Sequence, residues 1–205
     1  MSNSSRHATR LIVLGAVHQF QPVHGYFVRR ELMTWHVDEW ANMHAGSIYN
    51  ALRTLKKDGY LLEDGTETEG NRPERTTYSV TEEGEVEFLR LLRQSIWNVE
   101  PFDTVSATML VSFMYALSRK EIISALEHRL TEIDARIKTN GFNVADVAQS
   151  KTTPVYVREI FELSSARLQG EKQWTLTLLG RIKDGEYFFA GETPNMPDRR
   201  HSTRR

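Results

Sequence analysis

The sequence contains no cysteine among its 205 residues. This absence excludes disulfide bonds, thiolate-bound zinc, iron–sulfur clusters and thiol nucleophiles. No apolar run is long enough to cross a membrane as a helix, and the polar start, MSNSSRHATR, lacks the pattern of a secretory signal peptide. The sequence therefore predicts a cytoplasmic protein that makes no use of a membrane.

An excess of charge of one sign is also absent. The formal net charge is −1, and residues 1–81 contain nine Lys or Arg and nine Asp or Glu, so their charges cancel. A strongly basic balance would have indicated nucleic acid as the partner. Any role in nucleic-acid binding must therefore come from the local arrangement of side chains.

Patterns typical of enzymes are missing as well. The sequence has no phosphate-binding glycine loop, no His-Glu-x-x-His pair and no Gly-x-Ser-x-Gly elbow. His36, Asp38, Glu39 and His44 lie in one connector and could supply nitrogen and oxygen ligands to a metal ion. Their spacing matches no standard metal motif, so a solvated polar loop is the favoured interpretation. We expect no enzyme activity, no metal and no cofactor.

The order of elements in the first half is informative. Apolar periodicity predicts helices at about residues 6–20, 24–35 and 45–58, followed by strands at 60–64 and 75–81. Three helices followed directly by a β-hairpin is the order found in a winged helix-turn-helix, in which the third helix enters the major groove.

The second half is predicted to be helical. Thr81 is a candidate N-cap for a helix at 82–97, and Ser118 and Glu121 form a capping box for a helix at 118–139 that ends at Asn140-Gly141. A last long helix is expected at 153–183. The heptad-like apolar stripe of helix 118–139 predicts a partner seam, either with helix 153–183 or between subunits.

These elements predict a mainly α protein with a small β-hairpin and three parts. Residues 1–81 are expected to form a winged helix-turn-helix DNA-binding domain. Residues 82–183 are expected to form a long-helix dimerisation domain that could also bind an effector. Residues 184–205 contain four arginines, all among the last seven residues, and are expected to form a flexible basic tail.

The third predicted helix has two contrasting faces. Ile48, Leu52 and Leu55 share one narrow apolar stripe, while Asn50 and Arg53 lie opposite. A small, polar first turn followed by basic residues suits a helix that approaches base edges and phosphates. An ordinary amphipathic helix with a solvated polar face is the alternative interpretation.

Four fragments resemble the PadR family of bacterial transcriptional regulators. HGYFVRREL is similar to the family's HGYEI opening of the second helix, and GSIYNALRTLKKDGYL resembles its GSIYPALKRLEEEGLI helix. TYSVTEEG is similar to YYRLTEEG, and LQGEKQWTLTLLGRI resembles the family's last helix. The resemblance covers about residues 8–183 and is most specific over 24–84. It implies a homodimer that binds a palindromic operator on double-stranded DNA, usually as a repressor.

The resemblance also implies the DNA-binding residues by position. They are Ser47, Tyr49, Asn50, Arg53 and Lys57 on the third helix, Arg72 and Arg75 in the wing, and Tyr26 and Tyr78, for which packing is an equal alternative. Asn50 stands where the family often has proline, and asparagine could read adenine. The wing is less basic than is usual in the family, which predicts modest non-specific affinity and a shallow salt dependence.

Two further expectations concern partners. PadR regulators often respond to small molecules, and Trp97, Met109, Phe113, Met114 and Trp174 could line a pocket for an aromatic effector, with core packing as the alternative. The rival class is a winged-helix module that binds protein and not DNA, which the neutral charge of the first half favours.

Overall fold

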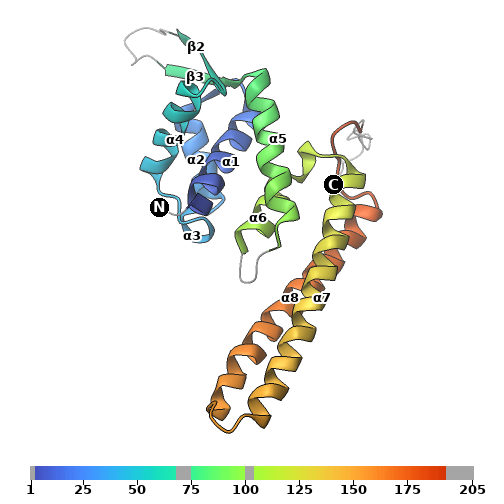
Figure 1. Cartoon of the computed structure of the whole chain (residues 1–205). Coiled ribbons are helices and arrows are strands. Elements are labelled where there is room, and N and C mark those ends of the chain that lie inside the picture. Colours follow the sequence, from blue (N-terminus) through green and yellow to red (C-terminus); the bar gives the residue numbers. More distant parts are fainter. Residues whose placement is uncertain (1–2, 68–74, 100–103, 193–205) are drawn as a thin grey trace, which may run out of the picture. The chain divides into compact units, whose positions relative to one another are not determined.

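The structure is a computed structural model that describes residues 3–67, 75–99 and 104–192 (Figure 1). The side chains of residues 3–5, 64–67, 75 and 104 are outside this description. The predicted fold class is confirmed, because the described chain is mainly helical with one small antiparallel sheet. None of its described helices combines the length and the apolar character needed to span a membrane. Two compact units, Met1–Phe113 and Met114–Arg205, make up the chain.

The first unit contains the predicted winged-helix elements. Its helices are α1 (Asn3–Phe20), α2 (Gly25–Thr34), α3 (Val37–Trp40), α4 (Ala45–Lys57), α5 (Glu82–Trp97) and α6 (Thr104–Phe113), and its strands are β1 (Val23–His24), β2 (Leu61–Glu67) and β3 (Arg75–Val80). The short helix α3 lies inside the predicted connector.

The sheet has the order β1-β3-β2, and both pairs of strands are antiparallel. In β1, Val23 pairs with Tyr78 of β3, while at the base of the hairpin Leu61 of β2 pairs with Val80. The sequence predicted only the β2–β3 hairpin, since a strand of two residues is too short to produce an alternating pattern. The extra strand ties the chain between α1 and α2 to the wing.

Helix α1 supplies the centre of the core in this unit. All residues from Leu11 to Leu14, together with Ala16 and Val17, are fully buried. The ring of Phe113 in α6 lies against Gly15 of α1, where an added Cβ would come within 2.5 Å of a ring carbon. Helices α5 and α6 therefore belong to this compact unit, which ends at Phe113. The predicted division into functional domains at residue 81 stays a prediction.

The start of α5 depends on a close backbone contact. The N–H of Gly84 donates to Oγ1 of Thr81 at 2.9 Å, which confirms Thr81 as the N-cap. The N–H of Thr81 in turn donates to the carbonyl of Tyr60. A Cβ added at Gly84 would lie 2.1 Å from that carbonyl oxygen. Only glycine allows α5 to begin this close to the base of the wing.

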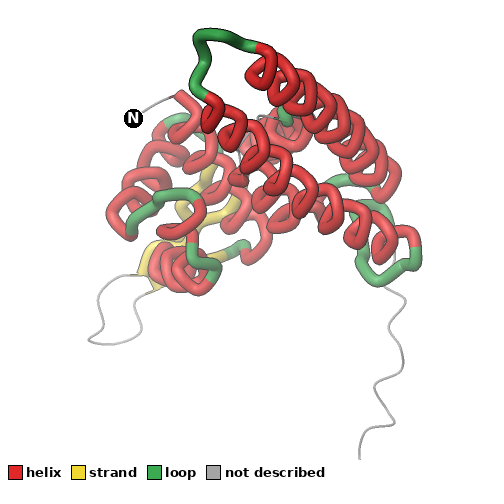
Figure 2. Tube along the Cα trace, turned by 90° about the horizontal axis from the view of Figure 1, so that it is seen from below, coloured by secondary structure: helices red, strands yellow, loops and turns green. Residues whose placement is uncertain are grey.

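The second unit is built on a long helical hairpin. It contains the 3-10 turns η1 (Met114–Ala116) and η2 (Val155–Val157) and the helices α7 (Arg119–Gln149) and α8 (Arg158–Lys183). The two helices run side by side in opposite directions (Figures 1 and 2). Buried Ile122, Leu126 and Ile133 of α7 and Leu178 and Ile182 of α8 form their seam. Of the two partners left open for the stripe, the structure shows the intramolecular one.

The predicted end of α7 at Asn140-Gly141 is wrong. The helix begins with the predicted Ser118 cap but continues to Gln149. Asn140 is buried, and its Nδ2 donates to Oγ of Ser165 on α8 at 3.2 Å. Packing against α8 therefore overrides a local stop signal that is adequate in isolation.

The segment 184–192 was expected to begin a flexible tail, but it packs on the second unit. Phe189 is almost fully buried. Arg119 at the start of α7 pairs with Glu192 at 2.7 and 2.8 Å and places its guanidinium over the ring of Phe189. Residues 193–205, which hold the four tail arginines, are outside the described residues.

Two glycine-to-alanine substitutions are expected to act in opposite directions. Gly84→Ala should destabilise the protein by about 1–3 kcal/mol, because the methyl group overlaps the Tyr60 carbonyl. Gly141→Ala should stabilise it by about 0.5–1 kcal/mol, because this site within α7 has open space around the added Cβ. Chemical denaturation of both variants and the unmodified protein measures the difference. Destabilisation by both substitutions would contradict the described course of α7.

Candidate nucleic-acid interface

Helix α4 is firmly held on its inner side. Ile48, Leu52 and Leu55 are at most 1% exposed, so the predicted apolar anchor is confirmed. The helix ends at Lys57 with Asp58 as its C-cap, and the next residue, Gly59, has a φ of +80°, a conformation that glycine adopts without strain. The N–H of Tyr60 then donates to the carbonyl of Leu55, and the chain turns into β2.

The outer side of α4 is open to solvent. Asn50, Arg53 and Lys57 are exposed, Tyr49 is 39% exposed, and Ser47 is half-buried. Nη2 of Arg53 donates to Oδ1 of Asn50 at 2.5 Å, one turn apart on the helix. The amide N–H groups of Asn50 and further guanidinium donors are then available for an outside acceptor. The two side chains form a preorganised polar pair on an anchored helix.

Three elements meet beside this pair. Gly25 begins α2, and a Cβ added there would lie 3.4 Å from the Tyr78 ring of β3 and 3.7 Å from the Tyr49 ring of α4. Burial raises the pKa of the Tyr78 phenol, and the nearby Arg53 guanidinium opposes that rise. The phenol therefore stays neutral at physiological pH and can donate a hydrogen bond.

Tyr26, in the first turn of α2, is the most exposed of the predicted tyrosines at 60%. The guanidinium of Arg29 lies 5.4 Å from the centre of its ring. Arg29 was not among the residues predicted from the sequence. An arginine three residues after an aromatic residue in a helix is common, so this spacing does not mark a site. The structure places Arg29 beside the exposed ring of Tyr26.

Two predicted wing residues remain untested. Arg72 is outside the described residues. Arg75 lies in β3, where its backbone pairs with Glu67, but its side chain is also outside the description. The DNA-binding role of every predicted residue stays a prediction, and the structure brings together Tyr49, Arg53 and Tyr78.

The electrostatics near α4 distinguish two neighbouring lysines. Lys56 forms an ion pair with Glu63 of β2. Lys57 is exposed one position further along the helix. Although the domain carries no excess charge, Arg53 and Lys57 therefore present positive charge on the outer face. A neutral composition is therefore compatible with a locally positive surface on α4.

The other predicted sites do not assemble in this way. Within the residues that the structure describes, no group of three or more His, Asp or Glu side chains is placed to hold a metal ion. In the segment predicted as a connector, His36 lies 3.3 Å from the carboxylate of Glu39. Of the predicted effector pocket, Met109 and Phe113 are buried in the first unit, whereas Met114 and Trp174 belong to the second. That pocket stays a prediction.

Comparison with known proteins finds similarity within the first unit. Residues 13–90 match the profile described as "Transcriptional regulator PadR-like family". No curated protein matches. Similar solved structures include Bacillus subtilis PadR in complex with operator DNA, at 18% identity and a TM-score of 0.38, covering 84% of this chain and 98% of that one. The smu.1604c protein from Streptococcus mutans UA159 matches at 23% identity and a TM-score of 0.37, covering 83% and 98%.

Bacillus subtilis PadR in complex with p-coumaric acid is also similar, at 16% identity and a TM-score of 0.36, covering 89% of this chain and 99% of that one. These TM-scores are low, so only the profile match bears on the family of this chain. The matched segment runs from the middle of α1 through the wing into α5 and includes the whole of α4. Over residues 13–90, the chain is therefore similar to the PadR-like family of transcriptional regulators.

Proposed function

We propose that the protein binds double-stranded DNA sequence-specifically and regulates transcription in the cytoplasm, with α4 as its recognition helix. The observation that carries this proposal is the exposed pair of Asn50 and Arg53 on a helix whose opposite side is buried. A helix fixed in this way can present the same two side chains to each base pair it meets. The match of residues 13–90 to the PadR-like family of transcriptional regulators supports the regulatory role.

The chemistry of the pair suits base edges in the major groove. Asparagine can bond adenine through two contacts, and arginine can bond guanine in the same way. The second lone pair of Asn50 Oδ1 remains for a base amino group while Arg53 holds the first. The side chains of Lys57 on α4 and Tyr26 on α2 are exposed and suit contacts with the phosphate backbone.

Loss of the polar pair should abolish the preference for the operator. In Asn50→Ala/Arg53→Ala, each lost base contact should cost about 1–3 kcal/mol, because these contacts distinguish bases. Selection of bound genomic fragments followed by footprinting identifies the operator, and fluorescence anisotropy then compares the affinities. Arg136→Ala, which removes an exposed positive charge from α7, is the control and should keep the footprint.

If the double variant folds and still gives the same footprint, α4 is not the recognition helix. Both changed residues are exposed, so the free energy of unfolding should stay within about 0.5 kcal/mol of the original.

The neighbouring lysines should differ in their effect on salt dependence. Lys57→Gln should lower the slope of log affinity against log salt by about 0.9, because one phosphate contact is lost. Lys56→Gln should change it less, because Glu63 already neutralises Lys56. Anisotropy titrations on a non-operator duplex at several salt concentrations give both slopes. Equal changes for the two variants would contradict the assignment of Lys57 to a phosphate.

We further infer a homodimer formed through α8. Tyr156 precedes this helix, and Ile160, Leu163 and Trp174 follow on it at heptad-like spacings of four, three and eleven residues. All four are exposed, from 71% for Tyr156 to 38% for Trp174. The same stripe includes Gly170, which has open space around it and would let a second helix approach closely.

Such a dimer would place two copies of α4 on a palindromic operator, with half-sites about 34 Å apart or a multiple of that spacing. Occupation of a promoter in this way favours repression. The alternative, a winged-helix module that binds protein and not DNA, predicts no footprint and no shift of any duplex even at low salt.

A charge placed in the stripe should dissociate the dimer. Leu163→Asp would bury a carboxylate in the proposed interface, so sedimentation should show a shift from dimer to monomer. Gln169→Asp introduces the same charge six residues further on, about 120° around the helix, and should stay dimeric. Dissociation by both variants, or by neither, would argue against this face of α8.

A further inference from the structure

The charges of the chain are divided unevenly between its last residues and the rest. Residues 193–205, which we call the basic arm, contain four arginines and one aspartate and so carry a net charge of +3. Since the whole chain carries −1, residues 1–192 carry −4. DNA is a dense polyanion, so it repels a body with this net charge at long range. The arm has the opposite sign.

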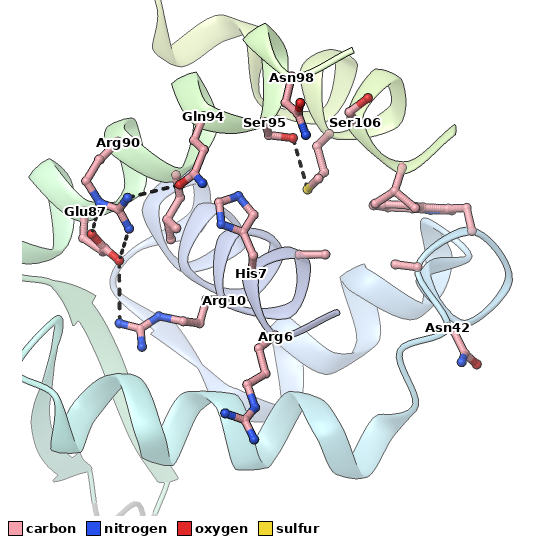
Figure 3. A pocket seen from close by; sticks show the side chains of 16 residues that line it. Arg6, His7, Arg10, Asn42, Glu87, Arg90, Gln94, Ser95, Asn98 and Ser106 are labelled. Carbon is pink, nitrogen blue, oxygen red and sulfur yellow. Dashed lines mark hydrogen bonds and ion pairs between the residues drawn. The ribbon is translucent and has the colours of Figure 1, made fainter. Parts of the chain in front are cut away.

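Carboxylates of the first unit already neutralise several of its cations. Figure 3 shows Arg90 bound to Glu87, through Nε at 2.7 Å and Nη2 at 3.0 Å, with Arg10 3.7 Å from the same carboxylate. Nη1 of Arg10 also donates to Asp58 at 3.2 Å. Cations held in this way have less to offer a phosphate, since each would first have to leave its carboxylate. Two further pairs of this kind are Arg30 with Glu31 and Lys56 with Glu63.

A cluster of contacts holds the residue before the arm at the start of α7. Nε and Nη2 of Arg119 donate to the two carboxylate oxygens of Glu192 at 2.7 and 2.8 Å, and these hydrogen bonds lower the pKa of that carboxyl. The same guanidinium donates to the backbone carbonyls of Ile182 and Tyr187. The carboxylate also accepts from the N–H of Phe189 at 3.2 Å. We call this set of contacts the Arg119 clasp.

The clasp fixes the point from which the arm leaves the second unit. The N–H of Ala190 donates to the carbonyl of Leu117 at 3.1 Å. Leu117 lies in the segment through which the chain enters this unit, four positions after Phe113, the last residue of the first unit. The other end of α7 is 31 residues away, or about 46 Å along the helix. The arm therefore starts at the end of the hairpin where the two units are joined.

We propose that the basic arm binds phosphates of the duplex outside the base pairs that α4 reads, and that the Arg119 clasp holds the arm in place for this contact. The inference rests on the proposed function, since it needs a duplex held by α4. Thirteen residues span at most about 45 Å, which is longer than one turn of DNA, about 34 Å. Arginine binds phosphate through two parallel hydrogen bonds and needs no particular base sequence.

Neutralisation of the arm in the full chain tests the contact. Fluorescence anisotropy on the operator at several salt concentrations gives the slope of log affinity against log salt. The slope should fall by about 0.9 for each arginine that contacts a phosphate, and so by up to about 3.6 when all four become glutamine. The matched control removes four exposed positive charges from the half of the hairpin away from the arm and should change the slope by less than about 0.9. The arm variant is Arg199→Gln/Arg200→Gln/Arg204→Gln/Arg205→Gln, and the control is Arg136→Gln/Lys138→Gln/Lys151→Gln/Arg158→Gln.

Hydroxyl-radical footprinting locates the contact. The unmodified protein should protect positions that flank the central footprint, and the arm variant should lose these outer protections and keep the centre. An unchanged slope and footprint in the arm variant, or equal changes in the control, would overturn the contact between the arm and DNA. Absence of any footprint with the unmodified protein would overturn the proposed function, and the contact with it.

Glu192→Ala tests the clasp, with Glu186→Ala as its control. Each substitution removes one carboxylate, and loss of negative charge alone should leave DNA binding equal or slightly tighter. Glu192→Ala also frees the arm from Arg119, so it should weaken operator binding severalfold, because the effective concentration of the arm at the duplex falls. Glu186 is exposed, and its carboxylate lies 4.0 Å from Arg181, outside the clasp. Operator binding by Glu192→Ala as tight as that by Glu186→Ala would overturn the role of the clasp.

Discussion

The burial of one face of α4 is the constraint on which the candidate interface depends. Ile48, Leu52 and Leu55 are removed from water in a core whose centre is α1. Each fully buried side chain of this kind contributes about 1.5–3 kcal/mol, which is far more than any single contact on the exposed face. The apolar face therefore fixes the rotation of α4 about its axis, and this rotation decides that Asn50 and Arg53 point outward.

Polar contacts fix what the apolar face leaves adjustable. A helix held only by an apolar stripe can still slide or tilt, but α4 ends at a carboxylate that Arg10 holds from α1. Arg10 also lies 3.7 Å from the carboxylate of Glu87 in α5. One side chain of α1 thus connects the C-terminal end of α4 with α5.

Local sequence signals predicted much of the first unit. Alternation of apolar and polar residues, the Thr81 cap and the glycine after Asp58 act over a few neighbouring residues, and all three are found as expected. The exposed polar face of α4 followed from the same periodicity. Resemblance to a family then indicated DNA binding, which the neutral charge of residues 1–81 does not indicate.

Signals that depend on distant contacts were missed. The contact between Arg10 and Asp58 joins residues 48 positions apart, and nothing in either neighbourhood indicates the other. The end of α7 was misplaced because Asn140-Gly141 is a good local stop, whereas burial of Asn140 against Ser165 favours continuation. The packing of segment 184–192 was missed for a similar reason. Glu192 pairs with Arg119, and the whole helical hairpin lies between these two residues in the sequence.

The polar contacts in the seam between α7 and α8 bear on how two copies could associate. Arg129 is buried in this seam and pairs with Glu171 at 2.6 Å, and Asn140 bonds Ser165 nearer the other end. Polar groups in an apolar seam select one register, because any shift would leave them buried without their partners. The stripe of α7 is thereby committed to α8 within one chain. The heptad-like stripe of α8 is exposed within the described residues, so it is the face through which we propose that two copies of this unit associate.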